Sequence, residues 1–296
     1  MTNSPFDDIK ALIAGLPEAG AGGVKADPAL GRLGQIRAWL SAWRMGPELR
    51  VNRPIIALYA GCAAGGDPEA VRGRLELIAA GGAAVNALTQ GVGAGLEAFD
   101  LAIDRPVGDM ALRAAMSERE CAATMAFGME ALAKQPDLLV VGSVGDNDAS
   151  AAAIALALYG GQASDWTLAA APYVAQAVQR AVEEAPSAEP LELLRQLGGR
   201  ETAAMAGAIL AARNQGVPVL LDGYGAAAAA AVLARIDAGS ILHVMAGDVS
   251  GEAGHARLLS KLNLQPIVKL GMDVGEGAGA AAVLSLVRAA CELNGL

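Results

Sequence analysis

Short apolar runs recur along this chain, and each is followed by a glycine-containing turn and then by a stretch with helical periodicity. This alternation is the pattern of βαβ units, in which a crossover helix joins two parallel strands. The runs are continuously apolar, which is typical of strands that helices cover on both faces. The predicted strands cover residues 55–60, 96–103, 137–141, 217–221, 241–246 and 266–270.

The predicted fold is an α/β fold with three α/β/α layers, built on a doubly wound, mainly parallel sheet of about six strands. The 296 residues are expected to form a single domain, because no shift in composition marks a boundary and this length is near the limit of one core. Residues 1–24 are polar, glycine-rich and weakly patterned, and we expect their ends to be loose. The predicted helices cover residues 30–43, 117–134, 149–159, 172–184, 201–214, 225–235, 252–262 and 277–294.

The composition excludes several classes of protein. Aromatic residues make up only 3% of the chain, so small and aliphatic side chains must build the core. The formal net charge is -9 and no run of lysine or arginine is present, which argues against a nucleic-acid partner. No strongly apolar stretch of about 20 residues occurs, so we expect no membrane span. The first residues lack the pattern of a signal peptide, and we expect a cytoplasmic protein.

The cysteines and histidines are predicted to be mainly structural. Cys62, Cys121 and Cys291 are too widely spaced for a disulfide framework or a zinc cluster and fit small core residues in a reducing compartment. The two histidines, His243 and His255, cannot build a His-rich metal site, and His255 is the stronger functional candidate of the two. We therefore expect neither a metal nor a cofactor.

Glycine next to an acidic or hydroxyl residue follows four of the predicted strands. In open α/β sheets ligands bind beyond the carboxyl ends of the strands, and glycine lets backbone N–H groups approach them. The sharpest example is Glu276, a carboxylate between Gly275 and Gly277 at the start of a predicted helix. This pattern indicates a site residue; the competing interpretation is an acidic side chain at the positive end of a helix dipole. Tyr224, which follows another of these turns, is a candidate for contact with an aromatic ligand.

Gly-Glu-Gly-Ala-Gly-Ala at residues 275–280 is the most telling of several sequence blocks that occur in a fixed order. It is similar to the Gly-Glu-Gly-Thr/Ser-Gly-Ala signature of the nicotinate-nucleotide:dimethylbenzimidazole phosphoribosyltransferase family, which the chain resembles. The order and spacing of the blocks are specific, and the resemblance runs from about residue 25 to the carboxyl terminus. The other blocks are Lys-Ala-Asp-Pro-Ala-Leu-Gly-Arg-Leu at 25–33, Gly-Gly-Ala-Ala-Val-Asn at 81–86, Gly-Gly-Arg-Glu-Thr-Ala at 198–203, Val-Leu-Leu-Asp-Gly at 219–223 and Ser-Gly-Glu at 250–252.

The resemblance implies a phosphoribosyltransferase that moves ribose phosphate from nicotinate mononucleotide to a benzimidazole-like base. Its product would be α-ribazole phosphate, used for the lower ligand of cobamides. The partners it implies are a small-molecule nucleotide and an aromatic base, with a homodimer and a small helical subdomain from residues 1–45 and part of the last helix. Glu276 matches the general base, which takes the proton of the attacking imidazole. The implied substrate-binding residues are Gly142, Ser143, Gly145, Ser150, Asp222, Gly223, Ser250, Gly251, Gly275 and Gly277.

The chain departs from the family in the blocks that hold the substrates. The family's Gly-Glu-Met-Gly-Ile-Gly-Asn-Thr-Thr reads Gly-Ser-Val-Gly-Asp-Asn-Asp-Ala-Ser at residues 142–150. Ser143 thus replaces a second active-site glutamate, while Asp146 and Asp148 add negative charge where the ribose phosphate should lie. The family's Asp-His-Gly is also replaced, by Cys-Ala-Ala-Gly at residues 62–65, the acceptor segment is shortened at 66–70, and no lysine occurs from residue 135 to 198.

Three functions remain open at this point. One is an active transferase with an altered acceptor, and another is an enzyme with a different nucleotide-like substrate. The third is a catalytically impaired paralogue that acts as a binding or partner subunit, with a homologous second chain. Two carboxylates near a phosphate dianion cost about 1 kcal/mol each at a surface-like dielectric. We therefore expect nicotinate mononucleotide to bind with a Kd above roughly 1 mM, unless Asp146 and Asp148 hold a divalent cation.

Overall fold

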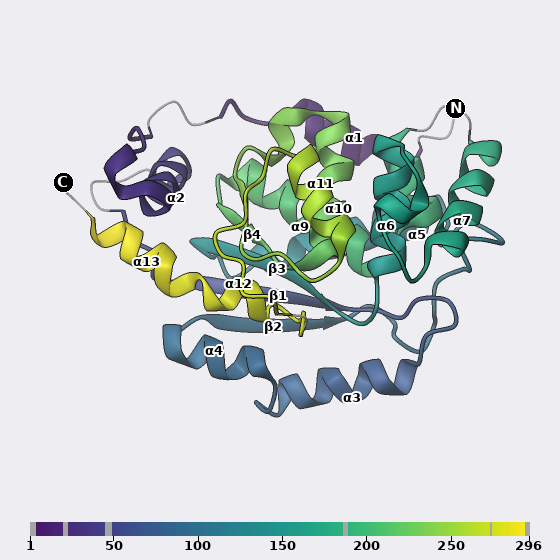
Figure 1. Cartoon of the computed structure of the whole chain (residues 1–296), viewed down its shortest axis with the longest axis horizontal. Helices are drawn as coiled ribbons and strands as arrows, with labels where there is room; N and C mark the ends of the chain where they lie inside the picture. Colours follow the sequence, from purple (N-terminus) through teal and green to yellow (C-terminus); the bar gives the residue numbers. More distant parts are fainter. Residues whose placement is uncertain (1–3, 20–22, 45–48, 186–188, 273, 294–296) are drawn as a thin grey trace.

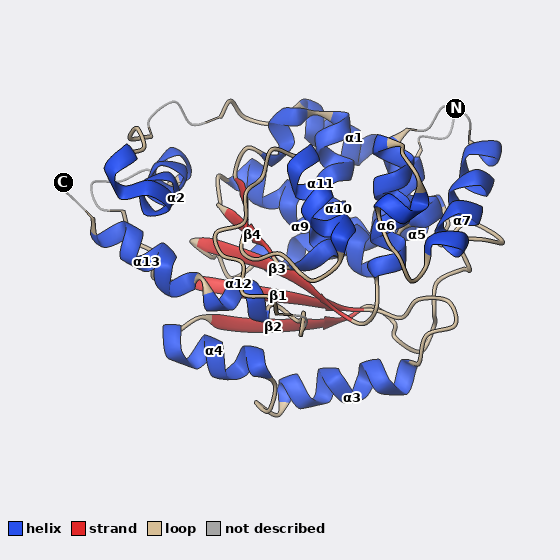
Figure 2. Ribbon diagram, in the orientation of Figure 1, coloured by secondary structure: helices blue, strands red, loops and turns tan. Residues whose placement is uncertain are grey.

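The structure is a computed structural model that describes residues 4–19, 23–44, 49–185, 189–272 and 274–293. A sheet of five parallel strands forms the middle layer of this part of the chain, with helices on both faces (Figures 1 and 2). The strand order is β2-β1-β3-β4-β5, so the order of the chain reverses between β1 and β3. The strands are β1 (Pro54–Ala60), β2 (Gly95–Asp100), β3 (Leu138–Val144), β4 (Val219–Leu221) and β5 (Val244–Ala246).

The apolar strands bury both faces because successive side chains point to opposite sides of the sheet. In β1, Ile55, Ala57 and Tyr59 belong to one buried cluster. Ile56 and Leu58 belong to a second cluster on the other face. This confirms the three-layer α/β/α fold that the continuous apolar runs predict.

Two groups of helices cover the sheet, and Figure 1 shows α3 and α4 on the side opposite α5–α7 and α9–α11. The larger cluster contains residues of α1 (Asp7–Ala14), α5 (Glu118–Gly128), α6 (Asp148–Tyr159), α7 (Ala171–Glu184), α8 (Pro190–Leu197), α9 (Arg200–Gln215), α10 (Gly223–Ile236) and α11 (Ala253–Lys261). The smaller cluster contains residues of α2 (Gly31–Trp43), α3 (Pro68–Ala79), α4 (Ala84–Val92), α12 (Ala278–Ala282) and α13 (Leu284–Glu292).

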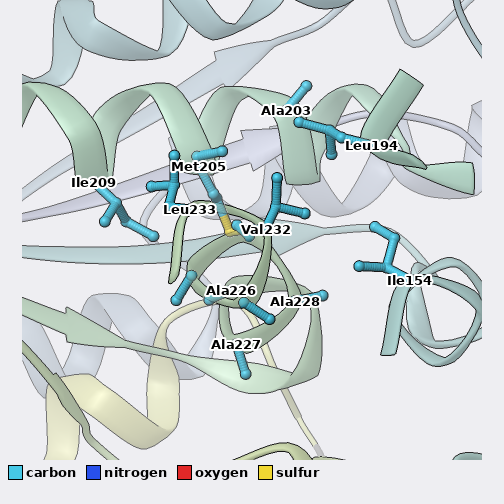
Figure 3. Packing of buried hydrophobic residues seen from close by; sticks show 14 of the residues in the cluster. Ile154, Leu194, Ala203, Met205, Ile209, Ala226, Ala227, Ala228, Val232 and Leu233 are labelled. Atoms are coloured by element: carbon cyan, nitrogen blue, oxygen red, sulfur yellow. The ribbon is translucent and has the colours of Figure 1, made fainter. Parts of the chain in front are cut away.

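Alanine and glycine allow the helices of the larger cluster to pack closely. The alanines at 226–231 in α10 are all fully buried, and Figure 3 shows three of them among Ile154, Met205 and Val232. Between α5 and α9 the backbones themselves are in contact. A Cβ added to Gly207 would lie only 1.8 Å from the carbonyl oxygen of Met125. Bulky aromatic side chains would not fit between helices that approach so closely, in keeping with the low aromatic content of the chain.

The Gly207→Ala variant is expected to lose about 2 kcal/mol of stability, because the added methyl group must push α5 and α9 apart. Gly73→Ala is the matched control, since Gly73 lies on the exposed side of α3 with open space around its added Cβ. The control should gain up to about 1 kcal/mol from the better helix propensity of alanine. Urea denaturation of both variants measures the difference, and an unchanged Gly207→Ala midpoint would contradict the close contact.

Several predicted elements differ from the structure. The expected sixth strand at 266–270 forms only an isolated bridge between Pro266 and Ala246, because β5 itself ends at Ala246 and leaves no further strand to pair with. The expected helix at 277–294 is divided at Val283 into α12 and α13. Helices α3, α4 and α8 were not predicted, nor was α1, which buries Ile9 and Ile13 in a segment that we expected to be weakly ordered.

The two helices described at 7–14 and 31–43 belong to different parts of the molecule. Helix α1 packs against α9, whereas α2 packs against α13, and Figure 1 shows α2 and α13 together at one end. We propose that the small helical subdomain consists of α2 and α13, within a single domain of 296 residues. None of the helices described is long and apolar enough to cross a membrane.

Candidate active site

A cavity of about 620 Å³ opens where the strands end at their carboxyl termini. Its walls come from the loops after β1, β3, β4 and β5 and from the first turns of α6, α9 and α10. The reversal of strand order between β1 and β3 makes the loops after these two strands diverge, which opens a crevice between them. The sequence predicts this location, because the glycine-containing turns follow these strands.

Most of the substrate-binding residues inferred from the sequence meet in this cavity. The lining includes Ser143, Gly145, Ser150, Asp222, Gly223, Ser250, Gly275 and Glu276. Gly142 and Gly277 lie behind the wall, where a Cβ on Gly142 would be 3.2 Å from the Gly277 nitrogen. Gly251 does not belong to the lining either and is exposed. Close packing of the backbone therefore accounts for Gly142 and Gly277. The residues that do line the cavity remain candidates for ligand contact.

Glu276 projects from a turn that only an unusual backbone can make. Gly275, Glu276 and Gly277 all have positive φ angles, of 64°, 56° and 78°. Asp222 holds this turn: its carboxylate accepts hydrogen bonds from the N–H groups of Gly277, at 2.8 Å, and Ala280, at 2.7 Å. The Asp-Gly block after β4 and the Gly-Glu-Gly block near the carboxyl terminus are thus two halves of one structure.

The carboxylate of Glu276 faces the cavity and has one charged partner. Its side chain is 9% exposed and forms an ion pair with Arg74 of α3, whose guanidinium is half-exposed. Arg74 also donates to the carbonyl oxygen of Val274, at 3.3 Å. Helix α3 begins within the shortened segment at 66–70, with Asp67 as its N-cap. Arg74 thus places a cation beside the candidate base, a contact that the sequence does not indicate.

A second carboxyl group, missed by the sequence analysis, lies at the crevice between β1 and β3. Glu201 is fully buried at the start of α9, and its carboxyl packs against the backbone of Gly61, Gly145 and Gly199. A Cβ added to Gly61 would lie 2.6 Å from this carboxyl carbon. Burial, with a smaller contribution from the charge of Asp146, raises the pKa of Glu201 to about 7. The group can therefore gain or lose a proton near neutral pH.

The signal for Glu201 is present in the sequence, because this residue lies within the Gly-Gly-Arg-Glu-Thr-Ala block. What the block does not reveal is that the carboxyl is buried beneath two strand ends. Asp222 is also buried, and burial raises the pKa of this carboxyl above its usual value. Three carboxyl groups of the candidate site thus have different surroundings: Glu276 is paired with arginine, Asp222 is hydrogen-bonded to the backbone, and Glu201 is enclosed by glycines.

Of the candidates Tyr224, His255 and His243, only Tyr224 lines the cavity. Tyr224 lines the cavity, as proposed, and its ring stacks on His255 with 5.7 Å between the ring centroids. The Nδ1 of His255 accepts a hydrogen bond from the N–H of Ser250, at 3.1 Å, and burial lowers the pKa of His255 to about 4. His255 is therefore neutral and positions Ser250 and Tyr224. His243 is buried outside the cavity, with its Nε2 3.0 Å from the Ile209 carbonyl oxygen.

The described residues bring together no group of three or more histidine, cysteine, aspartate or glutamate side chains that could hold a metal ion. Cys62, Cys121 and Cys291 are buried and free, as expected. Of these, only Cys62 lines the cavity, and burial raises the pKa of its thiol, so the neutral thiol prevails at neutral pH.

Comparisons with known proteins agree on one family. A family model described as Phosphoribosyltransferase matches residues 17–295. The chain is 46% identical over 319 residues to a protein of Sinorhizobium fredii named nicotinate-nucleotide–dimethylbenzimidazole phosphoribosyltransferase, covering 98% of this chain and 94% of the relative. A protein of the same name from Brucella melitensis is 46% identical over 314 residues, covering 97% and 93% of the two chains. A solved structure of this enzyme from Thermus thermophilus has a TM-score of 0.81 at 27% identity, covering 97% of this chain and 94% of that one.

Proposed function

This chain belongs to the nicotinate-nucleotide–dimethylbenzimidazole phosphoribosyltransferase family, and we propose that it catalyses the transfer of ribose phosphate from nicotinate mononucleotide to a benzimidazole-like base. With nicotinate mononucleotide as donor and 5,6-dimethylbenzimidazole as acceptor, the product is α-ribazole phosphate, which is used for the lower ligand of cobamides. The observation that carries the assignment of the site is Glu276, a carboxylate held at the cavity by the turn that Asp222 fixes.

The reaction needs one base and no general acid. A nitrogen of the acceptor attacks C1′ of the ribose, and a new C–N bond forms. The bond between C1′ and the pyridinium nitrogen breaks, and its electron pair stays on that nitrogen and neutralises the positive ring. The other nitrogen of the acceptor loses its proton, which Glu276 accepts within hydrogen-bond reach. The pyridinium leaving group requires no proton, so a single ionised carboxylate is sufficient.

Arg74 is paired with Glu276, so this ion pair must loosen before Glu276 can accept a proton. The Arg74 guanidinium forms an ion pair with this carboxylate, and Arg74 belongs to α3, the helix that begins within the shortened acceptor segment. An acceptor whose N–H approaches Glu276 must share or displace this contact. Since the Arg74 side chain is half-exposed, it can move into solvent at low cost.

Incubation with millimolar nicotinate mononucleotide and a panel of benzimidazoles and phenols is expected to release nicotinate, measured by liquid chromatography. Release should depend on the acceptor, because its attacking nitrogen or oxygen must form a bond to C1′ as the bond between C1′ and nicotinate breaks. Nicotinate that forms at the same rate without any acceptor would indicate hydrolysis instead. If no acceptor leads to release, the enzyme function fails and the chain acts as a binding or partner subunit.

We further propose that the protein is a cytoplasmic homodimer. Three free buried cysteines fit a reducing compartment, and the dimer follows from the resemblance to the family. Light scattering coupled to size-exclusion chromatography distinguishes a dimer from a 29.7 kDa monomer.

A further inference from the structure

Glu201 presents a buried carboxyl group to the cavity. The residue is 2% exposed and belongs to the cavity lining. Among the described residues, only its own backbone N–H donates a hydrogen bond to this carboxyl. The neighbouring Arg200 directs its guanidinium to the carboxylate of Glu120, with Nε 2.9 Å from Oε1. Buried polar groups are nearly always satisfied, so a carboxyl that is left open toward a cavity indicates a ligand.

The backbone around Glu201 leaves room for this carboxyl and for nothing larger. An added Cβ would lie 2.6 Å from the carboxyl carbon at Gly61 and 2.5 Å from Oε2 at Gly199. Gly145 lies on a third side, with an added Cβ 3.7 Å from Oε1. A competing explanation is that an acidic residue favours the positive end of the α9 dipole. An exposed glutamate would do the same without the cost of burial, so the enclosure by three glycines points to a role in the site.

The end of β3 runs from the turn of Glu276 to the carboxyl of Glu201. Gly142 lies beside the Gly277 nitrogen, whereas Gly145, three residues further along the chain, lies beside Glu201. Three extended residues span about 10 Å. Both carboxyl groups line the same cavity. A span of this size accommodates an acceptor ring followed by the ribose that it attacks.

The hydrogen-bonding groups of the donor narrow the choice of ligand group. Ionised nicotinate mononucleotide carries a phosphate and a ring carboxylate, which only accept hydrogen bonds and are repelled by a carboxylate. Its hydrogen-bond donors are the 2′- and 3′-hydroxyl groups of the ribose. In dinucleotide-binding folds an acidic side chain pairs with such a hydroxyl. Burial raises the pKa of Glu201 to about 7, so at pH 8 this carboxyl is mainly ionised and accepts hydrogen bonds.

From this arrangement we propose that Glu201 binds the ribose of the donor, with its two carboxylate oxygens accepting hydrogen bonds from the 2′- and 3′-hydroxyl groups. The proposal rests on the transfer function above and adds a residue that holds the donor. Glu276 and Glu201 then have separate tasks. Glu276 takes the proton of the acceptor, whereas Glu201 orients the sugar whose C1′ is attacked.

Titration calorimetry at pH 8 tests the contact with the carbocyclic analogue of nicotinate mononucleotide and its 2′,3′-dideoxy form, which cannot lose nicotinate during the titration. The unmodified protein is expected to bind the diol at least about tenfold more tightly than the dideoxy form, because the latter lacks the hydrogen bonds to a charged group. Glu201→Gln should weaken binding of the diol at least about fivefold. The same variant should bind the dideoxy form equally or more tightly, since it removes a negative charge. Glu183→Gln, which removes an exposed carboxylate of α7 outside the cavity, should change neither affinity.

Equal weakening of both ligands by Glu201→Gln would show a structural role and overturn the proposal, as would unchanged binding of the diol. Urea denaturation at pH 8 shows whether the variant is folded. If it is not, the two ligands decide on the unmodified protein alone, and equal affinities overturn the proposal.

Turnover of nicotinate mononucleotide is measured separately through nicotinate release. Glu201→Gln should raise the KM of the donor more than it lowers kcat, because the ribose contact is already present in the ground state. A loss in kcat alone would identify Glu201 as a base and overturn the proposal. If the diol is preferred as expected and no nicotinate is released, the proposal stands and the transfer function fails. If nicotinate is released and the two ligands bind equally, the function stands and the proposal fails. If neither ligand binds, the proposal fails as well.

Discussion

The Glu276→Gln variant is expected to lose at least about a hundredfold in kcat, the scale of rate enhancement that a positioned general base supplies. Glutamine keeps the size of the side chain and can keep the turn that Asp222 holds, but its amide cannot take the proton of the acceptor. Since this interaction develops only in the transition state, kcat should fall while KM changes little. Steady-state nicotinate release with the best donor and acceptor measures both constants.

Glu69→Gln is the matched control for this variant. Glu69 lies in the first turn of α3, is exposed, and does not line the cavity, although the helix is the same one that carries Arg74. The activity of this variant should stay within about a factor of two of that of the unmodified protein. Substitutions at exposed positions change the free energy of unfolding by only about 0.5 kcal/mol or less. A Glu276→Gln variant with full turnover would remove Glu276 from the mechanism and leave Glu201 as the candidate base.

The Glu201→Gln variant is expected to be more stable than the unmodified protein at pH 8, by about 3 kcal/mol, and equal to it near pH 4. The reason is the difference between the folded-state pKa of Glu201, about 7, and the ordinary value of 4.5. Between these pH values the folded state binds more protons than the unfolded state. The stability that the protonated carboxyl contributes is therefore complete below pH 4.5 and is lost as the pH rises through 7. Glutamine stays neutral and avoids this loss.

Urea denaturation of both proteins at pH 5 and pH 8 isolates the effect, because the other titrating groups cancel in the difference. The unfolding temperature at pH 8 should rise by about 6 °C or more. Glu183→Gln provides the control, since this carboxylate is exposed and its replacement should shift stability equally at both pH values. A Glu201→Gln difference that does not depend on pH would show that this carboxyl has the same charge in the folded protein throughout the range.

The fold could be predicted because its main determinants are local. Continuous apolar runs such as residues 55–60 and 137–141 specify strands that are buried on both faces, and the alternation with helices specifies a parallel sheet. The helices that were missed have local causes as well. Helix α3 contains Gly73, and α4 follows the pair Gly81-Gly82, so glycine hides the helical pattern in both.

The site was predictable only where its residues are adjacent in the sequence. Glu276 is recognisable because two glycines flank it, and Asp222 because it follows a strand. The Arg74–Glu276 pair joins residues 202 positions apart, and the burial of Glu201 depends on Gly61 and Gly145, which directly follow β1 and β3. No local pattern encodes such contacts, because the strand order of the sheet creates them.

The most direct test of the account is a crystal structure of the protein with 5,6-dimethylbenzimidazole, since this complex does not depend on the affinity for the donor. We expect the base in the cavity between α3 and Glu276, with one ring nitrogen about 2.6–3.2 Å from a carboxylate oxygen of Glu276 and the guanidinium of Arg74 shifted from its contact in the unliganded protein. A base bound outside the cavity, or bound within it while Arg74 still covers the Glu276 carboxylate, would contradict the assignment of Glu276 as the base that accepts the acceptor's proton.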